Sequence, residues 1–439
     1  MLGVALGVRL LALAPFAAAT PVFDESYYLN VAEGIARGHG HTLGMRPEWA
    51  PGALRPPLFS FLLAGVLRVF GPSQPVLRAF QIPLSLLTVW LVFRIAARRY
   101  GTRGAGAAGL LCALSPSLVH YSHFLWAEHL AALLLTLFFF FVDRFDRGGR
   151  RRDLAAAGAA LGLAALTKEV WVYFGAVAAA WLLWGARPRW RAALPGAAIL
   201  LLALALTILP WTLRNQRALG RFVLVSTNQW FPIAMGNLYD PQRWLDPTPE
   251  DVRKAVIWRG QRLPRDKRAA FFKRVALDLI REQQPWWIGK KLVRTTITMY
   301  HLGSEQLRFL AKGWIQPGRL TARLLVVTDV LGHYALLVPG LLALWLVPGD
   351  RLKVLAVLAV LFLQGVHTLA NAVPRFTVPL LPLYALYAGA LLAGHAVRGP
   401  GRRWRLLAGA ACVAAAVLLP LPRSLAFLAK LWDRVATLP

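Results

Sequence analysis

Apolar residues recur along the chain in eleven runs, and most of these runs approach the length of a membrane-spanning helix. A span needs about 20 mostly apolar residues to cross roughly 30 Å of hydrocarbon. The runs fall at 2–20, 74–96, 104–120, 127–142, 154–166, 170–185, 193–211, 324–347, 353–371, 376–394 and 406–421. Several are short, and 154–166 is either a half-span or starts earlier. The pattern predicts an all-α polytopic membrane protein with about 10 to 12 transmembrane helices.

The first apolar run has a second interpretation, because Ala17 to Ala19 resemble a signal-peptide cleavage site. Arg9 interrupts this run and no basic residue precedes it, which argues against a cleaved signal. A start site placed too late, with a missing cytoplasmic leader, is an equal alternative.

Composition and charge favour a membrane protein over a nucleic-acid-binding one. The 439 residues are 57% hydrophobic, and a mean hydropathy of +0.51 is too apolar for a soluble enzyme of this length. The net charge is +30, and many of the arginines lie in short loops between spans. These basic loops follow alternate spans, at 94–104, 143–153, 185–191, 349–353 and 395–405. The positive-inside rule places them in the cytoplasm, so the segments between them face outward.

The longest polar region, 212–320, is predicted to lie outside the membrane. The chain then divides into an N-terminal transmembrane module (1–211), this extracytoplasmic α-rich region and C-terminal transmembrane helices (321–439). A connection of about 110 residues is usually functional or folds as a small domain, and an amphipathic helix is predicted near 265–283. The Trp and Arg content suits the headgroup zone and stacking on sugar rings, although a solvated domain explains the charges equally well.

Two adjacent carboxylates, Asp24 and Glu25, follow the first apolar run in "TPVFDESYYLNVAEGIARGHG". Apolar residues at helical spacing, from Tyr27 to Ile35, predict a short interfacial helix here. An acid in the first turn of a helix is stabilised by the free N–H groups and the dipole. Helix capping therefore explains the pair as well as catalysis does.

Further ionisable residues lie at the predicted outward ends of apolar segments: Arg55, Glu128, Lys168 and Arg375. Such charged groups are costly at a membrane boundary, and they usually form ion pairs or take part in function. Arg55 directly precedes a Pro-Pro pair, and it is either an interfacial anchor or a phosphate clamp. Lys168 either pairs with the neighbouring Glu169 or points to an anionic group, and Arg375 has the same two interpretations.

Three histidines, His120, His123 and His129, lie near Glu128 and raise the question of a metal site. Their irregular spacing lacks the regular signature of established sites. We therefore predict no metal.

The order of several motifs resembles the GT-C membrane glycosyltransferases. They are "DESYYLNVAEGIARG", "RPPLFSFLLAGVLRVFG", "SPSLVHYSHFLWAEHL", "LTK", "LPWTLRNQRALGRFVLVSTNQWFPIAMGN" and "PRFTVPLLPLYAL". The resemblance covers roughly residues 1–395 and is nearest to a bacterial branch related to protein O-mannosyltransferases and lipid A aminoarabinose or galacturonic acid transferases. The "WWDYG"-type signature of oligosaccharyltransferases is absent, which argues against that branch.

The resemblance implies that carboxylates act in catalysis. In this family the first outward loop carries an essential acid in an Asp-Glu pair, which matches Asp24 and Glu25. A second acid opens the fourth span, where this chain has Glu128. Tyr28 and His123 are expected to line the substrate cavity.

The resemblance also implies a cationic site for the donor phosphate. A basic residue before the Pro-Pro pair, Lys in many relatives, is Arg55 here. Arg375 matches the arginine of a "RY-x-x-P" pattern, with Phe in place of the usual Tyr. Lys168 is expected to join them at the leaving phosphate.

The implied activity is inverting transfer of a sugar from a polyprenyl-phosphate donor to a lipid, glycan or protein acceptor. It would occur on the extracytoplasmic side of the bacterial inner membrane. The acceptor hydroxyl needs a base, for which Asp24 is the best candidate, and cations at the leaving phosphate replace a metal, so no cofactor is implied. One alternative is a transporter or flippase of lipid-linked sugars, although no paired repeats are seen. A non-catalytic assembly protein of envelope glycan synthesis is another.

Overall fold

The computed structural model of the protein describes residues 1–17, 19–42, 50–239, 250–302, 304–399 and 401–438. Over these ranges the regular structure is helical, apart from one isolated bridge between Thr42 and Pro51. Helices satisfy every backbone hydrogen bond within the segment, as the hydrocarbon interior of a bilayer requires. The predicted all-α polytopic fold is confirmed. Parts of the predicted outward regions, 43–49 and 240–249, lie outside the described residues.

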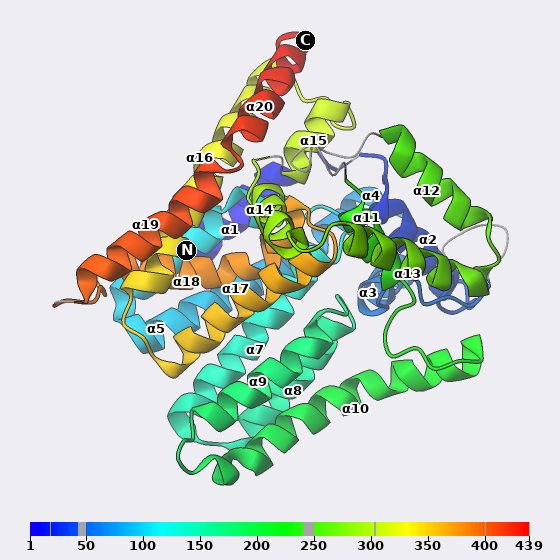
Figure 1. The fold of residues 1–439 in the computed structure, drawn as a ribbon. Coiled ribbons are helices and arrows are strands. Elements are labelled where there is room, and N and C mark those ends of the chain that lie inside the picture. Colours follow the sequence, from blue (N-terminus) through cyan, green and yellow to red (C-terminus); the bar gives the residue numbers. More distant parts are fainter. Residues whose placement is uncertain (18, 43–49, 240–249, 303, 400, 439) are drawn as a thin grey trace.

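The N-terminal module places short helices on both sides of its long ones (Figure 1). Its helices are α1 (Leu2–Leu13), α2 (Asp24–Ala36), α3 (Leu58–Phe70), α4 (Gln74–Ala79), α5 (Gln81–Leu114), α6 (Pro116–His120), α7 (Glu128–Gly148), α8 (Arg151–Ala165), α9 (Trp171–Trp184), the 3₁₀ helix η1 (Trp190–Ala193) and α10 (Leu194–Leu219). The short helix predicted around Tyr27 to Ile35 is present as α2.

Helix α5 consists of two halves that fold back on each other at Gly101. Gly101 has φ 68° and ψ −171°, a conformation that a glycine adopts without strain. The guanidinium of Arg9 in α1 reaches both halves, because it donates to Ser85 Oγ (2.6 Å) and to the Ala113 carbonyl (2.9 Å). In a straight helix those two residues would lie about 42 Å apart. The runs predicted at 74–96 and 104–120 are thus the two arms of one hairpin.

Within its described residues the polar region forms five helices. They are α11 (Trp230–Asn237), α12 (Glu250–Arg262), α13 (Arg265–Glu282), α14 (Trp287–Met299) and α15 (Glu305–Lys312). Of these, α11, α12 and α13 lie at the side of the bundle (Figure 1). Ala234 and Met235 of α11 pack with Phe272 and Ala276 of α13 in a small core of their own. The amphipathic helix expected near 265–283 corresponds to α13. The division of the chain into three domains stays a prediction.

The C-terminal part returns the chain to the bundle. Its helices are α16 (Arg319–Leu346), α17 (Arg351–Leu369), the 3₁₀ helix η2 (Pro374–Leu380), α18 (Leu381–Leu392), α19 (Arg402–Leu418) and α20 (Leu421–Ala436). α18 is the most enclosed of these, since every side chain from Leu381 to Ala390 is buried. Its Gly389 lies against the backbone of Ala108 in α5, where an added Cβ would come within 2.4 Å of the amide nitrogen. Small residues at such contacts let membrane helices approach closely.

Six helical stretches of the described chain are long and apolar enough to cross a membrane. They are Gln74–Leu114, Trp190–Leu219, Arg319–Leu346, Arg351–Leu369, Pro374–Leu392 and Arg402–Ala436. The first of these contains the hairpin of α5, so the number of stretches is not the number of crossings. Leu2–Leu13, Leu58–Phe70 and Trp171–Trp184 are shorter apolar helices. The predicted total of 10 to 12 transmembrane helices stays a prediction.

The predicted basic loops meet at one end of the bundle. Arg99 pairs with Asp143 near the end of α7 and with Asp350 just before α17, at 2.5 and 2.7 Å. The ring of His395 contacts the Tyr100 carbonyl at 3.2 Å, which brings in the loop after α18. The loop between α9 and α10 joins them around a cavity described below. Figure 1 shows α2 and α3 at the other end of α7 and α8.

Candidate active site

Asp24 lies at the first position of α2 and accepts hydrogen bonds from two arginines. Its Oδ1 is 2.6 Å from Arg55 Nη2, and its Oδ2 is 2.8 Å from Arg375 Nη2. Arg55 comes from the segment before α3, whereas Arg375 comes from η2. Asp24 keeps 16% of its side chain exposed, and Arg375 keeps 17%. The Asp24 carboxylate is therefore partly accessible between two mostly buried arginines.

Glu128 extends this arrangement on the other side of Arg375. Glu128 Oε1 accepts a hydrogen bond from Lys168 Nζ at 2.7 Å and lies 3.4 Å from Arg375 Nε. Five residues thus form an ion-pair chain, in the order Arg55, Asp24, Arg375, Glu128 and Lys168. Three cations and two anions leave it with a formal charge of +1. All five were predicted from the sequence, and the structure brings them together from segments far apart in the chain.

Aromatic rings surround the ion-pair chain. The Arg55 guanidinium lies 5.5 and 5.8 Å from the ring centroids of Tyr27 and Tyr28, and that of Arg375 lies 4.5 Å from Trp126. Cations are stabilised over such ring faces. Tyr28, predicted to line the substrate cavity, is only 2% exposed and lies beneath Arg55. Trp126 gave no signal in the sequence beyond its apolar surroundings.

The charges of the neighbours set the protonation of Asp24. Burial works to raise the pKa of this carboxyl, but Arg375, Arg55 and Lys168 outweigh burial and hold the pKa below its ordinary value. Asp24 is consequently ionised at neutral pH. Lys168 differs, because burial outweighs the attraction of Glu128 and lowers the pKa of its ammonium group.

Glu25 points away from the ion-pair chain, contrary to the catalytic part expected for it. Its side chain is fully buried and pairs with Arg78 of α4 at 2.8 Å. The carboxylate also accepts hydrogen bonds from the N–H groups of Leu125 (2.9 Å) and Val22 (3.3 Å). Because all its contacts tie α2 to α4 and to the segment before α7, the geometry gives Glu25 a structural role.

Both acids lie in the first turn of α2, as the capping interpretation expected, but neither caps the helix by a side-chain hydrogen bond. The N-cap of α2 is Phe23, and no side chain caps the helix by a hydrogen bond. Glu25 Oε2 contacts the Val22 N–H just outside the helix, whereas Asp24 bonds only to the arginines. The two adjacent acids therefore have different surroundings, and Asp24 alone faces the cationic site.

His123 also lies outside the ion-pair chain, although we expected it to line the substrate cavity. Its ring is fully buried and stacks on Phe16 of the segment after α1, with centroids 6.2 Å apart. Its carbonyl accepts a hydrogen bond from Arg78 Nη1, the same nitrogen that donates to Glu25 Oε1. Across the described residues, no three His, Cys, Asp or Glu side chains are arranged to hold a metal ion.

Glu305 was missed by the sequence analysis. It opens α15, is 5% exposed and pairs with Arg308 at 2.8 Å. Burial raises the pKa of its carboxyl, while Arg308 and Arg375 lower it. No motif of the sequence marked this acid, which lies in a polar region that carries many charges.

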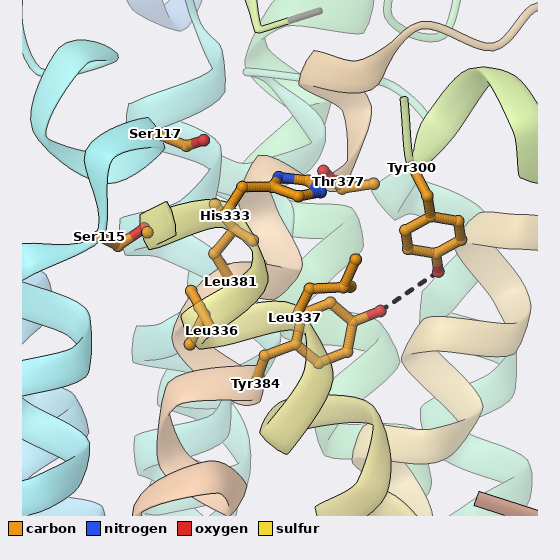
Figure 2. Close-up of a pocket in the computed structure, with 10 residues that line it drawn as sticks. Ser115, Ser117, Tyr300, His333, Leu336, Leu337, Thr377, Leu381 and Tyr384 are labelled. Atoms are coloured by element: carbon orange, nitrogen blue, oxygen red, sulfur yellow. Dashed lines mark hydrogen bonds between the residues drawn. The ribbon is translucent and has the colours of Figure 1, made fainter. Parts of the chain in front are cut away.

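A narrow pocket is lined by residues of α16, α18 and η2 and by none of the ion-pair chain. Figure 2 shows His333 beside Thr377, and the hydroxyls of Tyr300 and Tyr384 facing each other at 3.4 Å. Its free volume is about 10 Å³, enough for about one water molecule. It is too small for a sugar, so the ion-pair chain remains the candidate active site.

Comparisons with known proteins support the resemblance to membrane glycosyltransferases. Residues 54–211 match the family model described as dolichyl-phosphate-mannose-protein mannosyltransferase. That segment contains Arg55, Glu128 and Lys168 of the ion-pair chain. A search of curated proteins gave no match to the sequence.

The fold is similar to that of ArnT from Cupriavidus metallidurans, in a crystal structure bound to undecaprenyl phosphate. The TM-score is 0.55 at 17% sequence identity, over 99% of this chain and 70% of that one. The oligosaccharyltransferase of Archaeoglobus fulgidus, in a complex with Zn and sulfate, gives a TM-score of 0.49 at 14% identity. That match covers 98% of this chain and 53% of the other. The family segment and the ArnT-like fold confirm the resemblance to the GT-C glycosyltransferases, and with it a multi-pass membrane protein.

Proposed function

We propose that the protein is an inverting glycosyltransferase that moves a sugar from a polyprenyl-phosphate donor to a lipid, glycan or protein acceptor. The ion-pair chain carries this proposal, because it joins a carboxylate to three cations in one accessible site. Support also comes from the similar fold of ArnT, which was crystallised with undecaprenyl phosphate. The basic loops at the opposite end of the bundle favour an extracytoplasmic site in a bacterial inner membrane.

In the proposed reaction the acceptor hydroxyl attacks the anomeric carbon while Asp24 takes its proton. The bond from the anomeric carbon to the phosphate oxygen breaks, and its electron pair leaves with the polyprenyl phosphate. A single displacement inverts the configuration at that carbon. The negative charge that gathers on the phosphate is stabilised by Arg55, Arg375 and Lys168, as cations positioned at a developing anion do in other enzymes.

The same arginines can serve both the phosphate and Asp24. A guanidinium has five N–H donors, and Arg375 uses Nη2 for Asp24. When the donor phosphate shares the positive charge of Arg55 and Arg375, their hold on Asp24 weakens and its carboxylate becomes a better base. Substrate binding would thus raise the basicity of Asp24.

Product analysis with purified protein tests the proposal. The protein in lipid nanodiscs is incubated with extracted polyprenyl-phosphate sugars and candidate acceptors, and mass spectrometry follows glycosylated acceptor and free polyprenyl phosphate. We expect both products from the wild type and neither from Asp24→Asn, since general bases contribute about 10²–10⁴-fold to rates. The control is Asp278→Asn, which neutralises an exposed acid of α13.

Two outcomes would contradict the proposal. Wild-type turnover in Asp24→Asn would exclude Asp24 as the base. Movement of lipid-linked sugar between leaflets without release of polyprenyl phosphate would identify a transporter instead. The Asp24→Asn protein must elute as a folded monodisperse species, although its melting temperature is expected to be lower.

A further inference from the structure

A second cavity lies at the end of the bundle opposite the ion-pair chain. It opens between the α7–α8 connection, the end of α9, the start of α10 and the start of α17, and its free volume is about 320 Å³. That volume falls at the lower end of the range of small-molecule sites. Its lining includes Arg151, Arg189 and Arg351 together with Phe145, Leu154 and Leu182.

The arginines of this cavity are poorly neutralised by the protein. No ion pair of Arg151 or Arg189 occurs among the described residues, and Arg351 lies 3.8 Å from its one acidic neighbour, Asp146. Asp146 is bound more closely by Arg99, at 2.9 Å. Three arginines therefore line one space with little compensating charge. Such a space favours an anion, and phosphate oxygens match the geometry of guanidinium groups best.

The position of the cavity along the helices places it far from the active site. α7 has Glu128 of the ion-pair chain at its start and Gly149, which lines the cavity, directly after its end. Its 21 residues span about 30 Å, close to the thickness of a hydrocarbon core. α8 runs back from Arg151 at the cavity towards Lys168 (Figure 1). The cavity and the active site thus lie at opposite membrane boundaries.

Exposed aromatic and apolar side chains place the cavity at headgroup depth. Trp184 ends α9 and Trp190 opens η1, and they are 49% and 44% exposed. Tryptophans gather where hydrocarbon meets headgroups. Leu194 and Leu202 of α10 are 44% and 60% exposed and provide apolar surface that leads from the cavity towards the bilayer interior. A ligand with an anionic head and an apolar tail would find both surfaces together.

We propose that this cavity binds the headgroup of an anionic phospholipid in the leaflet opposite the active site. The phosphate would lie between Arg151, Arg189 and Arg351. The glycerol and the first acyl carbons would lie against Leu154 and Leu182, with the tails along α10. A soluble phosphate compound would use the arginines but would leave the apolar walls in contact with water.

Lipid retention measured by native mass spectrometry tests the proposal. The full chain is reconstituted in mixed phosphatidylglycerol and phosphatidylcholine, extracted in mild detergent, and its bound lipids are counted. We expect the wild type to retain one phosphatidylglycerol preferentially and Arg151→Gln/Arg189→Gln to retain it at least about tenfold less. Each basic residue near anionic headgroups changes affinity roughly fivefold, which gives this scale.

Two further variants separate the cavity from general surface charge. Arg402→Gln/Arg403→Gln removes two exposed arginines of α19 outside the cavity and should retain phosphatidylglycerol like the wild type. Ala193→Trp fills the cavity while keeping every arginine, and should lose the lipid. Equal loss in the α19 variant, or retention in Ala193→Trp, would overturn the proposal. Equal retention of both lipids by the wild type would do the same.

Free inorganic phosphate is the remaining alternative ligand for the cavity. Inorganic phosphate at millimolar concentration should not displace the retained phosphatidylglycerol, because it lacks the apolar contacts. Displacement by phosphate would show that the cavity takes a soluble anion and would refute a lipid site. None of these measurements depends on sugar transfer, so their outcome is independent of the proposed function.

Discussion

Asp24 and Arg375 are 351 positions apart in the sequence, yet Asp24 Oδ2 accepts a hydrogen bond from Arg375 Nη2 at 2.8 Å. This contact joins the first outward loop to the segment before α18. Arg375 also approaches Glu128, so one guanidinium connects the two carboxylates. The candidate active site therefore exists only when both ends of the chain are folded together.

The pH dependence of stability should report the ionisation of Asp24. Its pKa in the folded protein is below the ordinary value of 3.8, so its ion pairs stabilise the fold fully above the unfolded pKa. This contribution is lost as the pH falls through the lower folded pKa. We expect the difference in melting temperature between wild type and Asp24→Asn to stay constant from pH 8 to about 5 and to narrow below about 4. Narrowing already near pH 6 would contradict this assignment.

Arg375→Lys should impair donor use more than it impairs folding. Lysine keeps the charge but cannot reach Asp24 and Glu128 with two separate nitrogens as Arg375 does. One lost hydrogen bond to a charged group is worth about 1.5–3 kcal/mol, so kcat/KM should fall roughly 10- to 150-fold. Steady-state kinetics with the lipid-linked donor measures this change. Arg68→Lys, at an exposed position of α3, is the matched control and should leave kcat/KM unaltered.

The members of the ion-pair chain were predictable because polar residues at the ends of apolar runs must gather at a boundary. The run at 127–142 correctly indicated that Glu128 opens a helix, which the structure shows as α7 (Glu128–Gly148). Alternating basic loops likewise indicated which ends of the helices lie together, as the contacts of Arg99 show. Both inferences use only the length and polarity of segments.

Side-chain direction was not predictable in the same way. Asp24 and Glu25 are neighbours on one helix, and a helix turns about 100° per residue, so they point to different surroundings. The partner of Glu25 is Arg78, which lies in the short helix α4 and had no sequence feature to distinguish it. Without tertiary packing, the structural acid could not be told from the accessible one. The part of His123 in the substrate cavity stays a prediction, since its buried ring stacks on Phe16.

Glu25→Gln should reduce stability rather than chemistry. Removing one member of a fully buried ion pair leaves an uncompensated charge and costs about 3–5 kcal/mol. We expect a lower melting temperature and less folded protein, while the folded fraction keeps its turnover. In a double-mutant cycle with Arg78→Met, the combined loss should be smaller than the sum of the single losses by about 0.5–3 kcal/mol. Lost turnover at an unchanged melting temperature would instead make Glu25 catalytic.

Gly389→Ala should destabilise the contact between α5 and α18. An added Cβ would lie 2.4 Å from the amide nitrogen and 2.6 Å from the Cα of Ala108, and backbone atoms cannot move aside as a flexible side chain can. The two helices must separate, which costs about 1–3 kcal/mol by analogy with overpacked cores. Gly365→Ala in α17 is the matched control, because nothing lies within 4 Å of its added Cβ. Alanine there should be neutral or stabilise the helix by about 0.5–1 kcal/mol. Thermal unfolding in detergent should therefore give shifts of opposite sign or very different size, and equal shifts would contradict the close approach of α5 and α18.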